Sequence, residues 1–497
     1  MRLSQLLPQA GGGADPEIAS IVNDSRLAGP GALFFAMPGA RTSGENFMRQ
    51  ALEKGAAAVV AASQPPAALR AAFPGAVFLS AGDLQRALSA AAAAFYGRPS
   101  EKLQVYGLTG TKGKTTTAYL LESVLARAGA APGVVGTIEY RVGGRVLAAA
   151  ANTTPFAHTL QELLARMAAA GAKAAVMEVS SHALAGGRVE DVAFDVAAFL
   201  NLQSDHLDFH GTRENYFEAK AGLFALLERS PKPRRAAVLN ADDPAARELG
   251  RRLGGRLKTF TFALDSPADL RAERLELGAD HAAFTLAAAG RRLPVRLNLL
   301  GRHNVCNALA AIACAFAGGV PLETAAEGAA ALRNVPGRLE RVDLGQDFTV
   351  FVDYAHTAAA LESVLANLRP LARGRLITVF GCGGDRDRTK RAPMGRAACS
   401  LSDLAIATTD NPRGEDPARI FADIEEGVRG FFSNYEIVPD RGEAIARAIG
   451  SARAGDIVLI AGKGHETYQI FKDRTVHFSD AEAAAAALRA KGGGHAA

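Results

Sequence analysis

A glycine-rich stretch, Gly110 to Thr117 (GTKGKTTT), has the residue types and spacing of a phosphate-binding loop. An apolar segment that favours a strand precedes it, and an amphipathic segment that favours a helix follows. Backbone N–H groups of such a turn, together with the helix N-terminus, can hold phosphate oxygens. Lys114 would then reach the terminal phosphates, and the Thr115 hydroxyl would bind Mg²⁺. Leu108 stands where the strict P-loop pattern has glycine, so we interpret the stretch as a shortened relative of that loop.

Polar side chains also follow two other apolar segments, MEVSSHAL and NLQSDHLDFHG. Hard oxygen ligands such as Thr115 and Glu178 suit Mg²⁺. The alternative is that His206 and His210, four positions apart, bind zinc, which requires both on one helix. The surrounding sequence favours a turn, and either histidine alone is more often structural. We therefore expect an oxygen-ligated magnesium site.

Lys220 lies in a segment, TRENYFEAKAGLFALLERS, that is typical of a helix with Thr212 as its N-cap. Phe217, Phe224 and Leu227 mark the face of that helix that turns inward, and Lys220 falls on the same face. A buried lysine is costly unless it is paired or modified. The alternative is a lysine whose stem is buried while its ammonium reaches water. We expect a functional role.

The stretch AIATTDNPRGEDP, Ala405 to Pro417, is typical of a buried strand that ends in a turn. Pro412 restricts its own backbone and that of Asn411, so Asn411 and Arg413 would lie beyond the strand end. In open α/β sheets, ligands bind at the carboxyl ends of strands. Asn, Pro and Asp are also ordinary turn residues, so a solvated turn is the alternative.

Strands alternating with helices predict mostly parallel, doubly wound sheets. The 497 residues exceed what one core accommodates, and we expect three α/β domains at residues 1–99, 100–335 and 336–497. The third contains strands ending in glycine-rich or polar turns, as in nucleotide-binding sheets.

Composition favours a soluble globular enzyme, with 48% hydrophobic and 22% charged residues. A net charge of +5 is small for this length and does not indicate a nucleic-acid-binding protein. The four cysteines show no CxxC spacing, which fits a reducing compartment. We find no signal-peptide pattern and no membrane-spanning run, and we expect a cytoplasmic enzyme.

Ten motifs occur in one order along the chain: GTKGKTTT, NTTP, EVSSHAL, SDHLDFHG, YFEAK, GRHNVCNAL, DYAHT, GCGGDRDRTKR, DNPR and GKGHE. Together they resemble the Mur ligases of peptidoglycan synthesis over essentially the whole chain. The resemblance implies an N-terminal UDP-sugar-binding domain, a central domain with a P-loop-type ATPase sheet and a C-terminal domain with a Rossmann-like sheet that binds an amino acid. It also implies ATP-dependent amide formation. ATP would phosphorylate the D-glutamyl γ-carboxylate of UDP-MurNAc-L-Ala-D-Glu, and the amine of the incoming amino acid would attack the acyl phosphate.

The resemblance also implies roles for residues of the central and C-terminal regions. The catalytic positions are Lys114, Glu178, His206 and Lys220. The implied ligands of Mg²⁺ are Thr115, Glu178, His206 and Lys220, the last carbamylated to N6-carboxylysine. The implied ATP-binding residues are Gly110, Thr111, Lys112, Gly113, Lys114, Thr115, Thr116, Asn304, Asn307, Arg338, Asp353 and His356.

Two further sets follow from the same resemblance. The UDP-MurNAc-dipeptide would contact Ser25, Thr153, Thr154, Ser180 and Arg188, with the loop Gly39 to Thr42 beside the uridine. The incoming amino acid would contact Arg386, Asp410, Asn411, Pro412, Arg413, Gly462 and Glu466. In the family, DNPR marks enzymes that accept meso-diaminopimelate, and an arginine fork suits its extra carboxylate.

Several alternatives stay open at this point. The same ligase could add L-lysine or another diamino acid, and a folylpolyglutamate synthetase-like ligase shares the phosphate loop and the modified lysine. A P-loop ATPase or kinase would need no amino-acid-binding domain, and a non-enzymatic nucleotide-binding scaffold would not need the catalytic set. The resemblance implies small-molecule substrates and a monomer, with neither nucleic acid nor membrane as partner.

Overall fold

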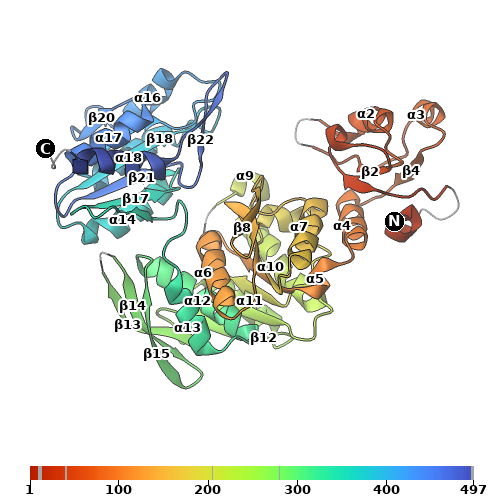
Figure 1. Cartoon of the computed structure of the whole chain (residues 1–497), viewed down its shortest axis with the longest axis horizontal. Coiled ribbons are helices and arrows are strands. Elements are labelled where there is room, and N and C mark those ends of the chain that lie inside the picture. Colours follow the sequence, from red (N-terminus) through yellow and green to blue (C-terminus); the bar gives the residue numbers. More distant parts are fainter. Residues whose placement is uncertain (9–13, 40–41, 204, 279, 494–497) are drawn as a thin grey trace. The chain divides into compact units, whose positions relative to one another are not determined.

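The computed structural model describes residues 1–8, 14–39, 42–203, 205–278 and 280–493 (Figure 1). It is α/β throughout, as predicted. Packing divides the chain into two compact units. The first comprises Met1–Arg274, Thr285–Val295 and Cys306–Ala331, and the second comprises Leu275–Phe284, Arg296–Val305 and Leu332–Ala497.

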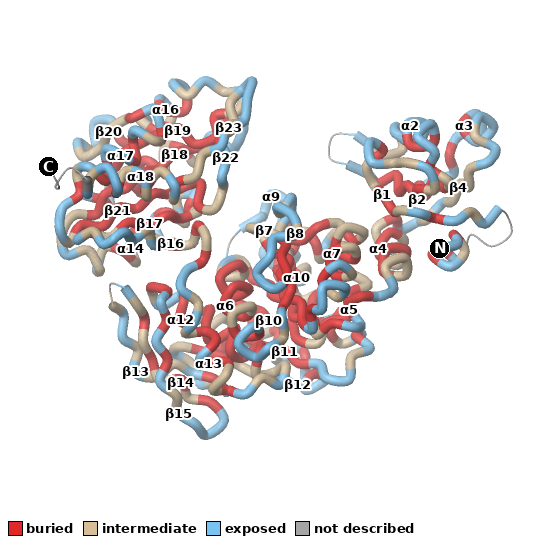
Figure 2. The backbone as a smooth tube through the Cα atoms, viewed as in Figure 1, coloured by how far each residue is buried: buried red, intermediate tan, exposed pale blue. Residues whose placement is uncertain are grey.

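The N-terminal part of the first unit contains a parallel sheet in the order β1-β2-β3-β4, whose strands are Ser20–Val22, Ala32–Phe35, Ala58–Ala61 and Val77–Ser80. The helices around it are α1 (Leu3–Leu6), η2 (Ser25–Leu27), η3 (Gly44–Phe47), α2 (Met48–Glu53), α3 (Ala67–Ala72) and α4 (Leu84–Phe95). Alternate residues of β2 and β3 join two separate apolar clusters, since successive strand side chains point to opposite faces. Both central strands are therefore wholly buried (Figure 2).

The second sheet has the order β15-β14-β13-β12-β11-β10-β5-β9-β6-β7-β8. Its strands in chain order are β5 (Gln104–Thr109), β6 (Gly133–Val135), β7 (Glu139–Val142), β8 (Arg145–Ala149), β9 (Ala174–Glu178), β10 (Val196–Phe199), β11 (Ala236–Asn240), β12 (Lys258–Ala263), β13 (Leu270–Leu277), β14 (Ala282–Ala288) and β15 (Arg291–Leu297). The strands from β12 through β6 pair in parallel, as predicted. The antiparallel edge β6-β7-β8 was not predicted, although Gly143 and Gly144, both with positive φ, form the two-residue turn that such a hairpin requires.

The helices of this region are α5 (Pro99–Lys102), α6 (Lys114–Arg127), α7 (Ala157–Ala169), α8 (Ser181–Ala185), α9 (Leu207–His210), α10 (Arg213–Arg229), α11 (Pro244–Leu253), α12 (Arg302–Ala317) and α13 (Leu322–Ala331). Thr212 caps α10 as predicted, since its side chain accepts the N–H of Asn215. The aromatic face of α10 packs into the core. Gly107 in β5 permits this packing, because a methyl group there would lie 3.1 Å from Leu223 of α10 and 2.8 Å from the ring of Phe194.

The second unit contains a sheet in the order β16-β17-β21-β18-β19-β20, with strands Glu340–Val342, Thr349–Asp353, Ile457–Ala461, Leu376–Cys382, Leu404–Thr409 and Tyr435–Ile437. Around it lie α14 (Ala358–Leu368), η4 (Arg369–Leu371), α15 (Arg391–Leu401), α16 (Pro417–Glu425), α17 (Arg441–Ser451) and α18 (Asp480–Gly493), and β22 (Tyr468–Ile470) pairs with β23 (Thr475–His477). Apolar clusters cover both faces. Strands β17, β21, β18 and β19 are mutually parallel, so the loops after them meet at one sheet edge.

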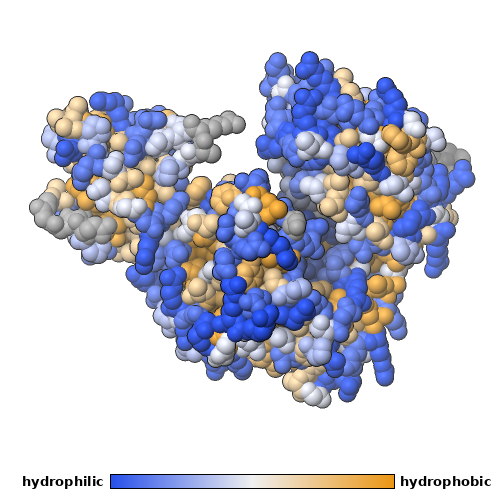
Figure 3. Space-filling view, turned by 180° about the vertical axis from the view of Figure 1, so that it is seen from behind, coloured by the Kyte–Doolittle hydropathy of each residue, from blue (hydrophilic) through white to orange (hydrophobic). Residues whose placement is uncertain are grey.

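Hydrophilic residues dominate the face seen in Figure 3, with smaller hydrophobic areas between them. No helix in the described part of the chain has the length and apolar character needed to cross a membrane.

Candidate active site

The predicted phosphate loop connects β5 to the first turn of α6. Gly113 forms the N-cap of α6 with φ of +87°, a conformation that favours glycine. A methyl group at Gly113 would also collide with Oδ1 of Asn307, so Asn307 lies directly against the loop. Nζ of Lys114 donates to the carbonyl oxygen of Gly110 at 2.7 Å and to that of Thr111 at 3.1 Å. The structure thus brings together the loop, its lysine and one of the two predicted nucleotide-binding asparagines.

Two predicted cation ligands meet beside this loop. Oγ1 of Thr115 donates to Oε2 of Glu178 at 3.0 Å, and both residues are buried. Thr137, which sequence reasoning did not select, donates to the same carboxylate with its N–H at 2.9 Å and its hydroxyl at 3.0 Å. Its hydroxyl also lies 3.1 Å from that of Thr153. Thr137 therefore links the carboxylate to a residue predicted to contact the sugar-peptide.

Lys220 is buried, as its position on the apolar face of α10 predicted, with 1% of its surface exposed. Its Nζ donates to the carbonyl oxygen of Gly110 at 3.0 Å and lies 4.4 Å from the ring centre of Tyr216. Burial, with a further contribution from the charge of Lys114, lowers the pKa of Lys220 to about 6. At neutral pH the Lys220 amine is thus mainly uncharged, which is the nucleophilic form.

The two histidines of SDHLDFHG are placed differently. The prediction of a turn without a helix was wrong, since Leu207–His210 forms the one-turn helix α9 with His206 as its N-cap. The His206 side chain is about half exposed, and its ring centre lies 6.1 Å from that of Tyr216. His210 is buried and bonds to the Ser181 hydroxyl at 3.0 Å through Nε2. Within the described residues, no group of three or more His, Cys, Asp or Glu side chains could hold a metal ion.

The residues predicted to contact the sugar-peptide form one cluster in the first unit. The Thr154 hydroxyl donates to the carbonyl oxygen of Glu178 at 2.8 Å and accepts the N–H of Ser180 at 3.0 Å. Arg188 donates to the carbonyl oxygen of Thr154 at 2.9 Å and lies over the Phe156 ring at 4.5 Å. These residues connect directly to the Glu178 strand end.

The predicted uridine contacts lie in the N-terminal part of the first unit. Ser25 is buried there and donates to Oε1 of Gln50 at 2.7 Å. In the predicted loop Gly39 to Thr42, Ala40 and Arg41 lie outside the described residues.

Four predicted ATP-binding residues belong to the second unit. Asp353 ends β17 and accepts two backbone N–H bonds. Its burial raises the pKa of its carboxyl. Arg338 lies 5.1 Å from the Tyr354 ring, and its buried Nε has no hydrogen-bond partner among the described residues. His356 bonds to the carbonyl oxygen of Tyr354 at 2.8 Å, and Asn304 donates to a backbone carbonyl. Tyr354 is thus surrounded by Asp353, Arg338 and His356. The Nε–H of Arg338 is a donor that a ligand could satisfy.

The DNPR loop follows β19 at the predicted position. Asp410, Asn411 and Pro412 are buried, so the alternative of a wholly solvated turn does not describe them. Arg413 has φ of +52°, and its Nη1 donates to the carbonyl oxygen of Gly384 at 2.9 Å. The loop therefore packs against the turn that follows β18 and holds Arg413 there.

The other predicted amino-acid contacts lie in the same unit. A methyl group at Gly383 would lie 3.0 Å from Nη1 of Arg413 and 3.8 Å from Cγ of Arg386. A methyl group at Gly462 would lie 2.9 Å from Oδ2 of Asp410. Glu466 accepts the Asn411 amide at 2.9 Å. Arg386, Asp410, Arg413, Gly462 and Glu466 are thus brought together around the ends of β18, β19 and β21.

Sequence reasoning missed two residues that hold these loops. Asn201, after β10, accepts the N–H of Lys112 at 2.9 Å and donates to its carbonyl oxygen at 3.0 Å, which braces the phosphate loop. Arg391 is fully buried and binds both oxygens of Glu415, at 2.8 and 2.7 Å, and Asp423 at 2.7 Å. Arg391 is the last residue of the motif GCGGDRDRTKR, and Asn201 is the first residue of the segment NLQSDHLDFHG. Their roles were missed because their partners are distant in sequence.

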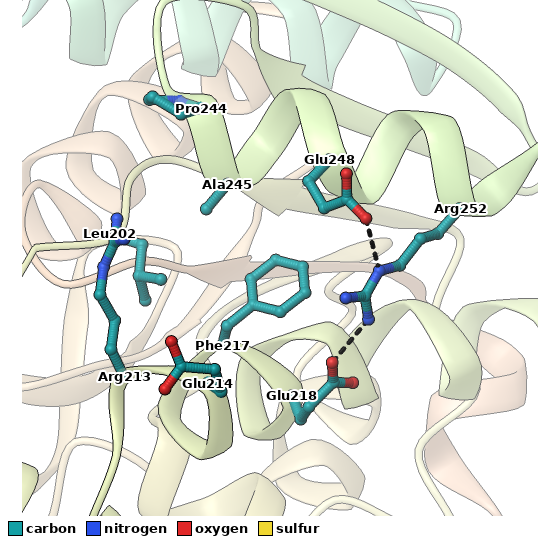
Figure 4. Close-up of a pocket in the computed structure, with 9 residues that line it drawn as sticks. All are labelled: Leu202, Arg213, Glu214, Phe217, Glu218, Pro244, Ala245, Glu248 and Arg252. Carbon is teal, nitrogen blue, oxygen red and sulfur yellow. Dashed lines mark hydrogen bonds and ion pairs between the residues drawn. The ribbon is translucent and has the colours of Figure 1, made fainter.

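A surface pocket lies between α10 and α11 (Figure 4). Phe217 forms part of its lining, and Arg252 bridges Glu218 and Glu248 at 2.5 and 3.0 Å. None of the predicted site residues lines this pocket.

Three family models match the chain. They are the Mur ligase family catalytic domain at residues 17–96, the Mur ligase middle domain at 108–315 and the Mur ligase glutamate ligase domain at 337–464.

Individual relatives match nearly the full length. The UDP-N-acetylmuramoyl-L-alanyl-D-glutamate–2,6-diaminopimelate ligase of Solibacter usitatus is 47% identical, over 96% of this chain and 95% of its own length. The protein of the same name from Geobacillus thermodenitrificans is 44% identical, over 98% and 99%. A solved structure of a ligase of that name has a TM-score of 0.70 and 31% identity, covering 99% of both chains.

Proposed function

Because this chain belongs to the Mur ligase family, we propose that it joins meso-2,6-diaminopimelate to UDP-MurNAc-L-Ala-D-Glu in an ATP-dependent, amide-forming reaction of peptidoglycan precursor synthesis. One observation carries the proposal. The Gly110 carbonyl oxygen of the phosphate loop accepts hydrogen bonds from both Lys114 and the buried Lys220. A simple nucleotide-binding scaffold has no need of a second, desolvated lysine at this position.

The proposed reaction has two steps. The γ-phosphoryl group of ATP passes to the D-glutamyl γ-carboxylate, which forms an acyl phosphate and ADP. The amine of diaminopimelate then attacks the acyl carbon, and the tetrahedral intermediate expels phosphate. Such a transfer depends mainly on positioning and charge neutralisation. Lys114 supplies a positive charge at the phosphate loop, and Asn307 lies against the loop at Gly113.

The residues present fit a magnesium ion. The Thr115 hydroxyl and the Glu178 carboxylate are hard oxygen donors at the phosphate loop, the type that Mg²⁺ prefers. Mg²⁺ usually keeps several waters and takes further ligands from substrate phosphates, so a small protein donor set is sufficient. When bound, the ion neutralises charge on phosphate oxygens. His206 and a modified Lys220 complete the proposed ligand set.

We propose that Lys220 carries a carbamate. Its uncharged amine would attack carbon dioxide, forming an N–C bond and releasing one proton. Burial, and next to it the charge of Lys114, lowers the pKa of Lys220 and so disfavours its charged amine. The carbamate product is instead an anion, which the charge of Lys114 attracts. It also converts a buried lysine into an oxygen donor.

The remaining assignments follow the three domains expected from the sequence. Residues 1–99, with Ser25, would bind the UDP moiety, while residues 100–335 would hold ATP and, through Thr153, Thr154, Ser180 and Arg188, the muramoyl peptide. Residues 336–497 would bind diaminopimelate, with Arg413 and Arg386 on its distal carboxylate and the Gly462 carbonyl and Glu466 on its distal ammonium. The proposed enzyme acts in the cytoplasm as a monomer.

The test is an omission assay. The protein is incubated with Mg-ATP, UDP-MurNAc-L-Ala-D-Glu and meso-diaminopimelate, and phosphate release is measured with each component left out. We expect release only in the complete mixture, together with a tripeptide product detected by mass spectrometry. Release without the amino acid would indicate an ATPase, and release with L-lysine in place of diaminopimelate would correct the substrate.

A further inference from the structure

Lys463, in the loop after β21, is completely buried. Its Nζ lies 3.0 Å from Oε2 of Glu466 and 3.2 Å from Oδ1 of Asn411. The ring centre of Tyr468 lies 5.5 Å away. A buried ammonium is costly unless it is paired. Here its partners come from two separate loops, both proposed to contact the incoming amino acid.

These contacts determine how the two loops present their polar atoms. Oδ1 of Asn411 also accepts the N–H of Ile470 at 2.9 Å, and its amide nitrogen donates to Oε2 of Glu466. In the described residues, both hydrogen bonds to the carboxylate of Glu466 reach the same oxygen, Oε2. Asn411 thus acts within the protein as a bridge, and the Glu466 carboxylate is oriented with its other oxygen away from these donors.

Several charged side chains surround Lys463 at these two loops. Positive charge at these loops comes from Arg386, Arg413 and Lys463, and negative charge comes from Asp385, Asp410, Glu415 and Glu466. The charges of Glu466, Arg413 and Asp410 all act on the Tyr468 hydroxyl, so they share one neighbourhood. Arg441 and Asp480 beside them form a buried ion pair that adds no net charge.

The two candidate amino acids differ in the charge of their distal ends. That end of diaminopimelate carries a carboxylate and an ammonium and is neutral overall, whereas that of lysine carries only an ammonium. The buried ammonium of Lys463 opposes the net positive end of lysine more strongly than the neutral end of diaminopimelate, because like charges brought together disfavour the wrong partner.

We propose that Lys463 is a specificity-determining, positioning residue: through Glu466 and Asn411 it shapes the amino-acid pocket, and its buried charge disfavours L-lysine relative to diaminopimelate. This proposal rests on the proposed function and deepens it. Lys463 does not contact the substrate; it acts by neutralising and orienting Glu466, the residue proposed to receive the distal ammonium.

Two substitutions separate charge from hydrogen bonding. Lys463→Gln retains an amide donor of similar length but no charge, whereas Lys463→Arg retains the charge. The measured quantity is the ratio of kcat/KM for meso-diaminopimelate to that for L-lysine, at saturating ATP and UDP-MurNAc-dipeptide. In Lys463→Gln we expect the ratio to fall on the order of tenfold, with the KM for ATP unchanged. Lys463→Arg should keep the ratio of the wild type.

Lys491→Met is a matched control, because Lys491 of the same unit donates to backbone carbonyl oxygens near the end of α17 and lies over the ring of Phe348. It should leave the ratio unchanged. A folded Lys463→Gln protein with a ratio within about twofold of the wild type, well below the expected discrimination, would overturn the role of Lys463 alone. Wild-type protein that uses neither amino acid would overturn the proposed function as well.

Discussion

The hydroxyl of Thr115 donates to the carboxylate of Glu178 at 3.0 Å, although 63 positions separate the two residues in the sequence. The contact arises because β5 and β9 are parallel neighbours with Leu108 paired to Glu178. The phosphate loop begins one residue beyond the end of β5, and the carboxylate lies at the end of β9. Neighbouring parallel strands therefore place a hydroxyl and a carboxylate at the same sheet edge, beside the proposed phosphates.

Glu178→Gln should lower ligase activity by roughly 100-fold or more, since a metal-assisted step loses several kcal/mol of charge stabilisation. Activity should be measured as tripeptide formation across a magnesium titration. Glu327→Gln, an exposed ion-pair residue of α13, is the control and should behave as the wild type. Full activity of Glu178→Gln would remove Glu178 from the proposed cation site.

Thr137→Val should raise the magnesium concentration needed for half-maximal activity on the order of tenfold, because residues that orient a metal ligand have effects of that size. The change removes the hydroxyl bond to Glu178 while keeping the side-chain shape. Thr137→Ser keeps the hydroxyl and should retain the wild-type requirement. Equal behaviour of the two variants would show that this hydroxyl does not position Glu178.

Lys220→Ala should abolish most activity, by roughly 100-fold or more, because the proposed carbamate oxygen is lost from the cation site. Added acetate or formate should restore part of it by occupying the vacated space as a carboxylate. Lys258→Ala, at an exposed position of β12, is the control for loss of a lysine. An active Lys220→Ala protein would contradict the assigned role, and failure of both anions to rescue would argue against a carbamate.

Arg413→Ala should weaken use of meso-diaminopimelate on the order of 100-fold, because truncating one partner of a buried charge pair costs several kcal/mol. The KM for ATP should change little. Arg413→Lys keeps the charge but lacks the bidentate fork, so its use of meso-diaminopimelate should lie between that of the wild type and that of Arg413→Ala. Steady-state kinetics with each substrate varied in turn measures this, and a parallel loss for ATP would refute the assignment.

Glu415 predicts a pH dependence of stability. Its hydrogen bond with Arg391 lowers the pKa of Glu415 from 4.5 to about 2. A carboxylate with a lowered pKa in the folded state stabilises that state above its unfolded pKa, and the contribution is lost as pH falls. The difference in unfolding free energy between wild type and Glu415→Gln should thus be constant above about pH 4.5 and shrink towards pH 2.

Denaturant unfolding between those pH values measures this difference. Glu426→Gln, at an exposed position later in the same unit, serves as the reference for loss of a carboxylate. A difference for Glu415→Gln that does not depend on pH would contradict the lowered pKa.

Local sequence patterns predicted most of the elements that carry the site. The phosphate loop lies between strand and helix, Thr212 caps α10, and Lys220 lies on its buried face. Each of these depends on turn chemistry or on helical periodicity, which a few neighbouring residues specify. The same reasoning failed for SDHLDFHG, where a single helical turn is too short to produce a periodic signal.

Contacts between residues of different strands and loops could not be predicted from local sequence patterns. By itself, the sequence determined which residues stand at strand ends and which face of α10 is apolar. Only the tertiary structure decided that Thr137 holds Glu178, that Asn201 braces the phosphate loop and that Lys463 lies buried between Asn411 and Glu466. The physical reason is that strand order and the packing of loops at a sheet edge come from long-range contacts, and these leave no local pattern in the chain.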